Sequence, residues 1–188
     1  MKVYFHYCLD GFANSYTVVN DDPKVRQALI VDPCKVDMQT LNILEYGGYE
    51  LVAVLITHNH SHHVNGLRTL MKIYSPTLYA ADSQVLGMSC EVLSGAGILR
   101  VAGLNVEFMS VPGHSPDSMV YKIEDALFTG DTLIPGVAGG TLSQYSHKLL
   151  CSRIKERIFR LSDRTVILPG HGAPGTIESE RQFNLDVT

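Results

Sequence analysis

The sequence predicts a layered α/β domain in which helices cover the outer faces of β-sheets. Two observations lead to this prediction. Short segments rich in β-branched and aromatic residues recur along the chain, and Leu51–Ile56 is apolar throughout, which is typical of a strand buried on both faces. Amphipathic segments such as Ser146–Leu161 lie between some of these strands. The length of 188 residues fits one domain, so we expect residues 1–188 to form a single unit.

In the first half of the chain, five short segments have the composition of strands. These segments are Val3–Tyr7, Ser15–Val19, Ala28–Val31, Leu51–Ile56 and Leu78–Ala80. Helical spacing predicts a helix over Val36–Tyr46, which precedes two glycines, and another over Gly66–Tyr74, which stops before Pro76. We expect a further short helix over Ser83–Met88.

The second half of the chain predicts two hairpins, a long helix and a last strand. One hairpin joins Leu99–Val101 to Val106–Val111 through a turn at Gly103. The other hairpin joins Met119–Ile123 to Leu127–Thr129. The remaining elements are a helix over Ser146–Leu161, a strand over Thr165–Leu168 and a helical turn or two over Glu178–Asn184.

The composition narrows the function classes. The net charge is −4, with 15 Lys and Arg against 19 Asp and Glu, which argues against a nucleic-acid partner. The longest apolar run has six residues, far below the ~20 that span a bilayer, and the N-terminus does not resemble a signal peptide. The four cysteines are widely spaced and lack a C-x-x-C pair. We therefore expect a cytoplasmic protein with no membrane and no nucleic-acid partner.

The segment Thr57–His63 carries four imidazoles in six residues, directly after the buried strand Leu51–Ile56. In an extended chain, His58 and His60 point the same way because side chains alternate. Neutral imidazole is the commonest metal ligand, and four such groups without a cation would leave donors and acceptors to satisfy. The internal position excludes a terminal tag. The segment therefore predicts a metal site in preference to an exposed polar loop.

Three further residues follow predicted strands in the same way. His114 lies in the turn Val111–Pro116, between glycine and proline, and His171 lies in a similar Pro-Gly-His-Gly segment. Asp131 follows a strand that ends in Thr-Gly. Each of these residues alone is an ordinary turn residue, but together with the histidine cluster they form a candidate ligand set. We find no convincing Ser-His-Asp or Cys-His arrangement that would replace metal chemistry.

This combination of segments resembles the metallo-β-lactamase superfamily. The family has an H-x-H-x-D-H motif after a buried strand, then a His in a P-G-H turn, an Asp after T-G and a late P-G-H. This chain has, in that order, HNHSHH, PGHSPDS, FTGDT and LPGHG between positions 58 and 172. Ala13–Tyr16 and Val31–Pro33 also resemble the family's opening strands. The stretch LPGHGAPGTIESERQFN is most similar to hydroxyacylglutathione hydrolases (glyoxalase II) and their small relatives.

The resemblance implies a four-layer αββα sandwich with a binuclear metal site at one edge. We expect two divalent transition metal ions, with zinc as the first choice and iron or manganese as alternatives. Asp32 matches a position that supports a ligand imidazole by accepting its other N–H, although a turn-forming Asp before Pro33 is the alternative. The ligand positions that carry over are His58, His60 and His114 for the first metal, His63 and His171 for the second, and Asp131 as the bridge.

The chain departs from the family pattern in two places. His62 stands where the family has a metal-binding Asp, so the second site either keeps His62 as a ligand, is completed by water, or is weakened. Only 17 residues follow His171, whereas glyoxalase II enzymes have a helical region there that holds glutathione. We therefore expect that a preference for glutathione thioesters does not carry over.

The leading functional hypothesis is a metal-dependent hydrolase that uses a metal-bound hydroxide on a small thioester or ester. The glycine-rich loop Ile134–Ser146 and the residues after it offer candidate substrate contacts, namely Tyr145, His147 and Lys148. A non-haem iron redox or oxygen-binding protein is one alternative, since His58, His114 and Asp131 could form the two-His-one-carboxylate set. A non-catalytic, metal-stabilised binding protein is another. The sequence leaves the substrate and the oligomeric state open.

Overall fold

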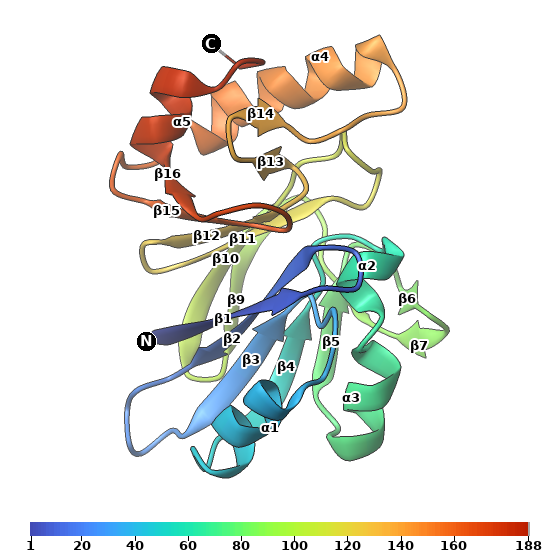
Figure 1. Ribbon diagram of the computed structural model, residues 1–188, viewed down its shortest axis with the longest axis vertical. Coiled ribbons are helices and arrows are strands. Elements are labelled where there is room, and N and C mark those ends of the chain that lie inside the picture. The colour runs from blue at the N-terminus through green and yellow to red at the C-terminus, as the bar shows by residue number, and fades with distance from the viewer. Residues whose placement is uncertain (188) are drawn as a thin grey trace.

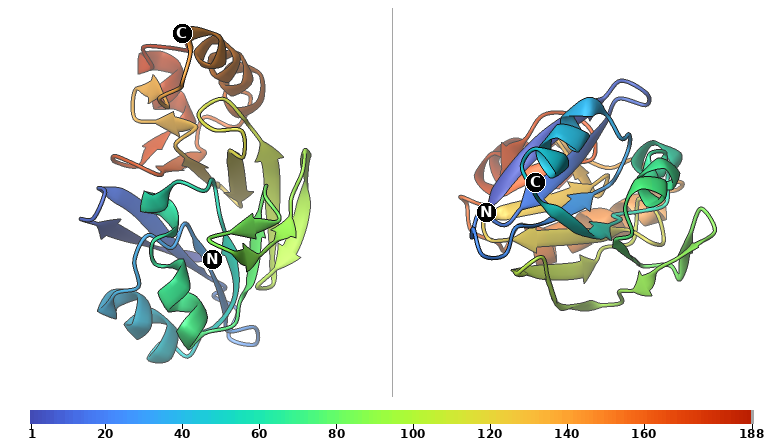
Figure 2. Two further views of the ribbon diagram at one scale, coloured as in Figure 1. Left: turned by 90° about the vertical axis from the view of Figure 1, so that its right-hand side faces the viewer. Right: turned by 90° about the horizontal axis from the view of Figure 1, so that it is seen from below.

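The computed structural model describes residues 1–187 and contains two six-stranded β-sheets packed face to face, with helices on both outer surfaces (Figure 1). In the side view of Figure 2, the blue-to-green helices and the orange-to-red helices lie at opposite ends of the molecule. The predicted four-layer αββα sandwich is therefore confirmed. Among these residues, no helix has the length and apolar character that crossing a bilayer requires.

The N-terminal sheet has the strand order β1-β2-β3-β4-β5-β8. Its strands are β1 (Lys2–Cys8), β2 (Ala13–Val19), β3 (Gln27–Val31), β4 (Glu50–Leu55), β5 (Thr77–Ala80) and β8 (Glu91–Val92). Strands β3, β4 and β5 are parallel, because the chain returns between them through helices α1 (Met38–Glu45) and α3 (Leu67–Ile73). The short helix α2 (Ser61–Val64) precedes α3.

The C-terminal sheet has the order β16-β15-β12-β11-β10-β9. Its strands are β9 (Ala96–Val101), β10 (Leu104–Ser110), β11 (Met119–Ile123), β12 (Ala126–Gly130), β15 (Val166–Pro169) and β16 (Gly175–Thr176). Only β12 and β15 are parallel neighbours among these described strands. The chain between them forms the small hairpin β13 (Leu133–Ile134) and β14 (Val137–Ala138), helix α4 (Gln144–Arg153) and the π-helical turn η1 (Ile154–Ile158). Helix α5 (Ile177–Phe183) follows β16.

Three apolar layers hold the sandwich together. Along β3, Leu29 faces the other sheet and Ile30 faces the helices, because successive side chains of a strand alternate. Leu29 packs in the layer between the sheets together with Phe128. Ile30 packs in the outer layer with Leu67 of α3. This two-sided burial explains why the central strands are apolar throughout. A third layer joins the C-terminal sheet to α4, η1 and α5.

Two local predictions from the sequence are wrong. The segment expected as a helix over Ser83–Met88 instead forms the hairpin β6 (Gln84–Val85) and β7 (Met88–Ser89). Its turn residues Leu86 and Gly87 have φ angles of 51° and 81°, which an α-helix does not tolerate. The second error concerns the cluster Thr57–His63, because its last residues belong to α2 and are not extended.

Candidate metal centre

The candidate ligands lie at one edge of the sandwich, where the strand ends of both sheets meet. His58 and His60 follow β4 of the N-terminal sheet, and His63 lies in α2. The C-terminal sheet supplies the others: His114 follows β10, Asp131 follows β12 and His171 follows β15. A ligand set drawn from both sheets therefore converges on the seam between them.

The first group of ligand atoms belongs to His58, His60, His114 and Asp131, which offer one atom each within 4.8 Å of one another. His114 Nε2 lies 3.1 Å from His60 Nδ1. The Nε2 atoms of His58 and His114 each lie 3.7 Å from Asp131 Oδ2. Three imidazoles and one carboxylate oxygen thus face a common point.

The second group consists of His63, Asp131 and His171. His63 Nε2 lies 3.5 Å from Asp131 Oδ2, and His171 Nδ1 lies 2.7 Å from Asp131 Oδ1. Asp131 belongs to both groups, because its Oδ2 faces histidines of both and its Oδ1 faces His171. Its carboxylate therefore lies in the position that a bridge between two cations requires.

Hydrogen bonds behind the rings determine which nitrogen faces the centre. Thr57 Oγ1 donates to Asp32 Oδ2 at 2.6 Å, so at 3.0 Å it can only accept from His58 Nδ1. His63 Nδ1 donates to Asp32 Oδ2 at 3.0 Å, and His114 Nδ1 donates to the carbonyl oxygen of Gly140 at 2.6 Å. With each Nδ1 acting as the donor, the Nε2 atoms of His58, His63 and His114 face the centre, and each offers a lone pair when its ring is neutral.

The buried nitrogens provide a test of whether these residues suit a cation. His58 Nε2 and His63 Nε2 are fully buried and have no hydrogen-bond partner among the described residues. A buried polar atom without a partner is costly, and coordination of a cation at this point would give both nitrogens a partner. Imidazole with carboxylate suits zinc and iron better than magnesium or calcium. The residues present therefore fit divalent transition metal ions.

Asp32 supports the ligands from behind. Its side chain is buried and accepts hydrogen bonds from the backbone N–H and hydroxyl of Thr57 as well as from His63. Its φ angle is 50°, a left-handed conformation that is uncommon for a residue with a side chain. Asp32 also groups with His58 and His63, but its oxygens are engaged by these donors. Its contacts are those expected of a residue that orients two ligand imidazoles.

In the first group, the imidazole rings of His58 and His60 are neutral at neutral pH. Burial, followed by the charge of His63, lowers the pKa of His58 to about 3. Burial and His114 also lower the pKa of His60. At neutral pH both rings therefore carry a free lone pair, as a metal ligand must.

The second group is an ion-paired cluster in the metal-free protein. Burial alone would lower the pKa of His63, but the neighbouring carboxylates of Asp131 and Asp32 outweigh it and raise that pKa to about 10. The hydrogen bond with Asp131 raises the pKa of His171. Burial works to raise the pKa of Asp131, but hydrogen bonds from His171 and His63 hold it well below its usual range.

Known proteins are similar to this chain in sequence and in fold. Hydroxyacylglutathione hydrolase of Chromohalobacter salexigens is 32% identical over 171 residues, which cover 87% of this chain and 64% of that protein. The solved structure of BLEG-1 B3 metallo-β-lactamase superposes with a TM-score of 0.87 over the whole of both chains, at 25% identity. This chain belongs to the metallo-β-lactamase superfamily. No protein-family model matches it.

Two other relatives illustrate the range of this superfamily. The probable metallo-hydrolase YqgX of Bacillus subtilis is 27% identical over 195 residues, covering 92% of this chain and 90% of that protein. Persulfide dioxygenase ETHE1 of Mus musculus is 28% identical over 183 residues, covering 93% and 72%. Membership in the superfamily therefore supports a metal enzyme but leaves the reaction to be argued from the site.

His62 stands where the superfamily motif has its Asp, and the structure places it outside the ligand groups. It is exposed on α2, and its ring centroid lies 6.4 Å from that of His171. Its ring also packs against Gly11, where a Cβ atom would collide with it. The carbonyl oxygen of Gly11 accepts from His171 Nε2 at 3.2 Å, so His62 borders the second group without joining it. Its role as a ligand stays a prediction.

The three candidate substrate contacts lie on α4. Tyr145 and Lys148 are exposed there. His147 Nε2 lies 3.7 Å from Asp186 Oδ1 and 3.6 Å from Cys151 Sγ, so it faces its own helix and the C-terminal segment. Contact between these residues and a substrate stays a prediction. The preceding loop is nearer to the ligands, since residues 140–142 share a hollow with His60 and His114.

Several residues that the sequence analysis did not single out shape this site of the superfamily fold. The Thr57 hydroxyl links His58 to Asp32, and it precedes the histidine cluster directly. Gly170 is required for close packing, since a Cβ atom there would lie 2.5 Å from Asp131 Oδ1. Asn14 Nδ2 donates to the carbonyl oxygen of Pro169 at 2.9 Å and so holds the His171 loop against β2. The repeated Pro-Gly-His pattern was the available signal for Gly170.

Proposed function

We propose that this protein is a metal-dependent hydrolase that cleaves a small thioester or ester. The observation that carries the proposal is the shared carboxylate of Asp131, which lies between two groups of histidines. Two divalent ions, with zinc as our first choice, fit this geometry. We also propose that the partner of the protein is a small-molecule substrate, with neither a nucleic acid nor a membrane involved, and that the protein is cytoplasmic.

The chain itself contributes orientation and charge to the reaction. Bound divalent ions would supply activated water at neutral pH and polarise the carbonyl of the substrate. Asp131 balances their charge, while Asp32 and Thr57 keep the rings of His63 and His58 in the productive orientation. A thiolate leaving group needs little protonation, so the absence of a dedicated acid among these residues favours thioesters.

A serine nucleophile is a poor alternative in this site. Ser115 follows His114 directly and is buried, but its Oγ lies 2.8 Å from Ser118 Oγ. His114 directs Nδ1 to a backbone carbonyl and Nε2 to the ligand centre. Among residues 1–187, no base contacts the Ser115 hydroxyl, which argues for activated water as the nucleophile.

The direct test is reconstitution. Chelator-treated protein should contain no transition metal ion and should not cleave a small acetyl thioester, and added zinc, iron or manganese should bind and restore turnover. His58→Ala combined with His114→Ala should lower both metal content and turnover. Asp125→Asn, an exposed change at the far end of β12, should leave both unchanged. Thioester cleavage that survives chelation, or metal-loaded protein without any turnover, would contradict the proposal.

One observation favours a second candidate. The persulfide dioxygenase ETHE1 of Mus musculus matches 93% of this chain, and His58, His114 and Asp131 form a two-His-one-carboxylate set with a shared focus. Under this alternative the protein would be a non-haem iron oxygenase. Iron-loaded protein would then consume oxygen in the presence of a persulfide, and zinc-loaded protein would be inactive. Hydrolysis with zinc and no oxygen uptake with iron would exclude it.

A further inference from the structure

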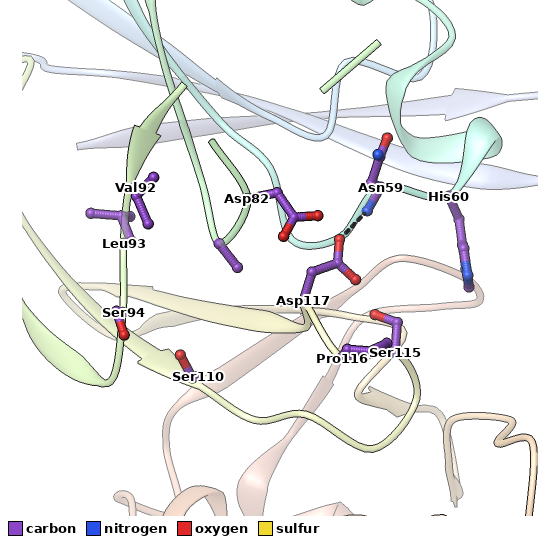
Figure 3. A pocket seen from close by; sticks show the side chains of 11 residues that line it. Asn59, His60, Asp82, Val92, Leu93, Ser94, Ser110, Ser115, Pro116 and Asp117 are labelled. Atoms are coloured by element: carbon purple, nitrogen blue, oxygen red, sulfur yellow. Dashed lines mark hydrogen bonds between the residues drawn. The ribbon is translucent and has the colours of Figure 1, made fainter. Parts of the chain in front are cut away.

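Two neighbouring hollows adjoin His60 of the candidate metal centre and share Ser115 and Pro116 as lining residues. The larger has a volume of about 530 Å³ and extends from His60 and Asn59 toward Asp82 and Ser94 (Figure 3). The smaller has about 340 Å³ and lies between His60, His114 and Leu142. A substrate whose reacting carbonyl sits beside the ligands would extend into both hollows.

The larger hollow has an acidic character. Figure 3 shows the carboxylates of Asp82 and Asp117 pointing into the same space. Asp117 Oδ2 accepts from the backbone N–H of Asn59 at 2.7 Å, while Asp82 is exposed and makes no described hydrogen bond or ion pair through its carboxylate. Three serines complete the polar wall, and no Lys or Arg is among the described lining residues.

Arg157 contacts the backbone of one lining residue from outside the larger hollow. The guanidinium of Arg157 donates to the backbone carbonyl oxygen of Ser110 at 3.1 Å, so it lies behind one wall of the hollow and does not line it. The space between Asp82 and Asp117 therefore favours a positive charge and disfavours a carboxylate.

The smaller hollow is mainly apolar. Its wall includes Pro116 and Leu142, and the Leu142 side chain is 99% exposed. An apolar side chain fully exposed beside a candidate reaction centre can cover an apolar part of a substrate. The two hollows thus differ in the chemical groups that they can bind.

We infer that the substrate carries an ammonium group on one side of its scissile bond, bound between Asp82 and Asp117, and an apolar group on the other, bound against Leu142. This inference rests on the proposed hydrolase function and narrows its substrate class to cationic thioesters or esters. It also implies that substrates with carboxylates, such as glutathione conjugates, bind poorly to the larger hollow.

A matched panel of thioesters tests the inference. Acetylthiocholine is cationic, S-(3,3-dimethylbutyl) thioacetate has the same shape without the charge, and S-acetyl-3-mercaptopropionate is anionic. For the metal-loaded protein we expect kcat/KM to fall in that order, by roughly fivefold at each step at low salt. The differences should shrink as salt is added, because salt screens the charges.

Substitutions of Asp82 test whether its carboxylate causes the preference for the cationic thioester. Asp82→Asn should remove most of the preference for acetylthiocholine over its neutral isostere, and Asp82→Lys should favour the anionic thioester. Asp125→Asn changes the net charge equally but lies at the far end of β12, so it should keep the wild-type order. Asp117 is left intact because its carboxylate holds the Asn59 backbone beside His60.

The outcomes separate this inference from the function on which it rests. Chelator-sensitive cleavage of all three thioesters at equal kcat/KM would overturn the charge preference and leave the hydrolase proposal standing. A preference for acetylthiocholine that persists in Asp82→Asn would also overturn this inference, because another part of the protein would then bind the positive charge. Metal-loaded protein that cleaves none of the three would overturn the hydrolase proposal, and this inference with it.

Discussion

The two ligand groups that share Asp131 differ in charge before any metal arrives. In the first group, burial keeps His58 and His60 neutral, so their lone pairs are ready for a cation. In the second group, carboxylates keep His63 protonated at neutral pH and raise the pKa of His171. The same ring type is therefore prepared for coordination in one group and must first lose a proton in the other. In the first group, burial outweighs the carboxylate of Asp131, whose Oδ2 lies 3.7 Å from His58 Nε2. In the second group, shorter contacts outweigh burial: Asp32 and Asp131 lie 3.0 and 3.5 Å from the ring nitrogens of His63, and Asp131 lies 2.7 Å from His171 Nδ1.

The strongest disturbance of both groups is Asp131→Ala. It removes the one carboxylate common to the two groups, so we expect thioester turnover to fall by at least about 10³-fold, since each bound ion contributes several kcal/mol to catalysis. Metal analysis should show that the second group no longer binds an ion. Wild-type metal content in this variant would show that Asp131 does not join the groups.

Thr57→Val should weaken metal binding by about 10–100-fold, because the valine cannot accept from His58 Nδ1 or donate to Asp32. Competition with a coloured chelator measures the affinity. Thr165→Val is the matched control, since Thr165 is also buried but makes no described side-chain hydrogen bond. Equal losses in the two variants would point to a general effect of the substitution on packing.

The charge difference itself predicts a pH dependence. With the pKa of His63 near 10, this ring is protonated from pH 7 to 9, and metal must displace its proton. Affinity of the second group should therefore fall about tenfold for each pH unit lost in this range, while affinity of the first group stays nearly constant, since the pKa of His58 is about 3. Calorimetry in buffers of different ionisation enthalpy counts the released protons. If the first metal released protons on binding and the second released none, the assignment of neutral rings to the first group and a protonated ring to the second would be wrong.

The metal-free protein should also lose stability as pH rises from 7 to 10. An unfolded His63 is neutral above about pH 6.5, whereas the folded ring keeps its proton up to about pH 10, so the folded state binds more protons in this window. We expect Tm to decrease by several degrees, and metal-loaded protein to show no such decrease. A flat Tm profile for the metal-free protein would contradict a charged His63.

The smallest effect is expected at His62. Its ring is exposed and lies beside His171, so His62→Ala should leave both metal affinities within about twofold of wild type. His62→Asp adds a negative charge near the second group and should tighten the second ion by roughly threefold, with the first unchanged. A large loss in His62→Ala would instead establish His62 as a ligand.

The sequence predicted the fold and the meeting of the candidate ligands because both depend on strand ends. Buried apolar runs identify β4, and short turns with glycine after β12 and β15 place Asp131 and His171 at the same edge. The conformation of the cluster itself was not predictable from alternation. Helix α2 begins at Ser61, turns His63 inward and leaves His62 exposed.

Contacts between segments that lie far apart in the chain could also not be predicted from the sequence. The hydroxyl of Thr57 acts through Asp32, which is 25 residues away, and Asn14 holds a loop 155 residues further along the chain. Such partners are determined only when the two sheets pack. The β6–β7 hairpin was missed for a similar reason, since its segment is short and its composition does not distinguish a helix from a tight turn.

The origin of the ligands in both sheets has a consequence for biosynthesis. A ribosome releases His58, His60 and His63 long before Asp131 and His171 have been made. The early histidines alone lack the carboxylate that both groups share, so a nascent chain holds metal weakly until β15 docks against β12. Metal capture is thereby delayed until Asp131 and His171 have been synthesised, and a bound ion then links strand ends of the C-terminal sheet to those of the N-terminal sheet.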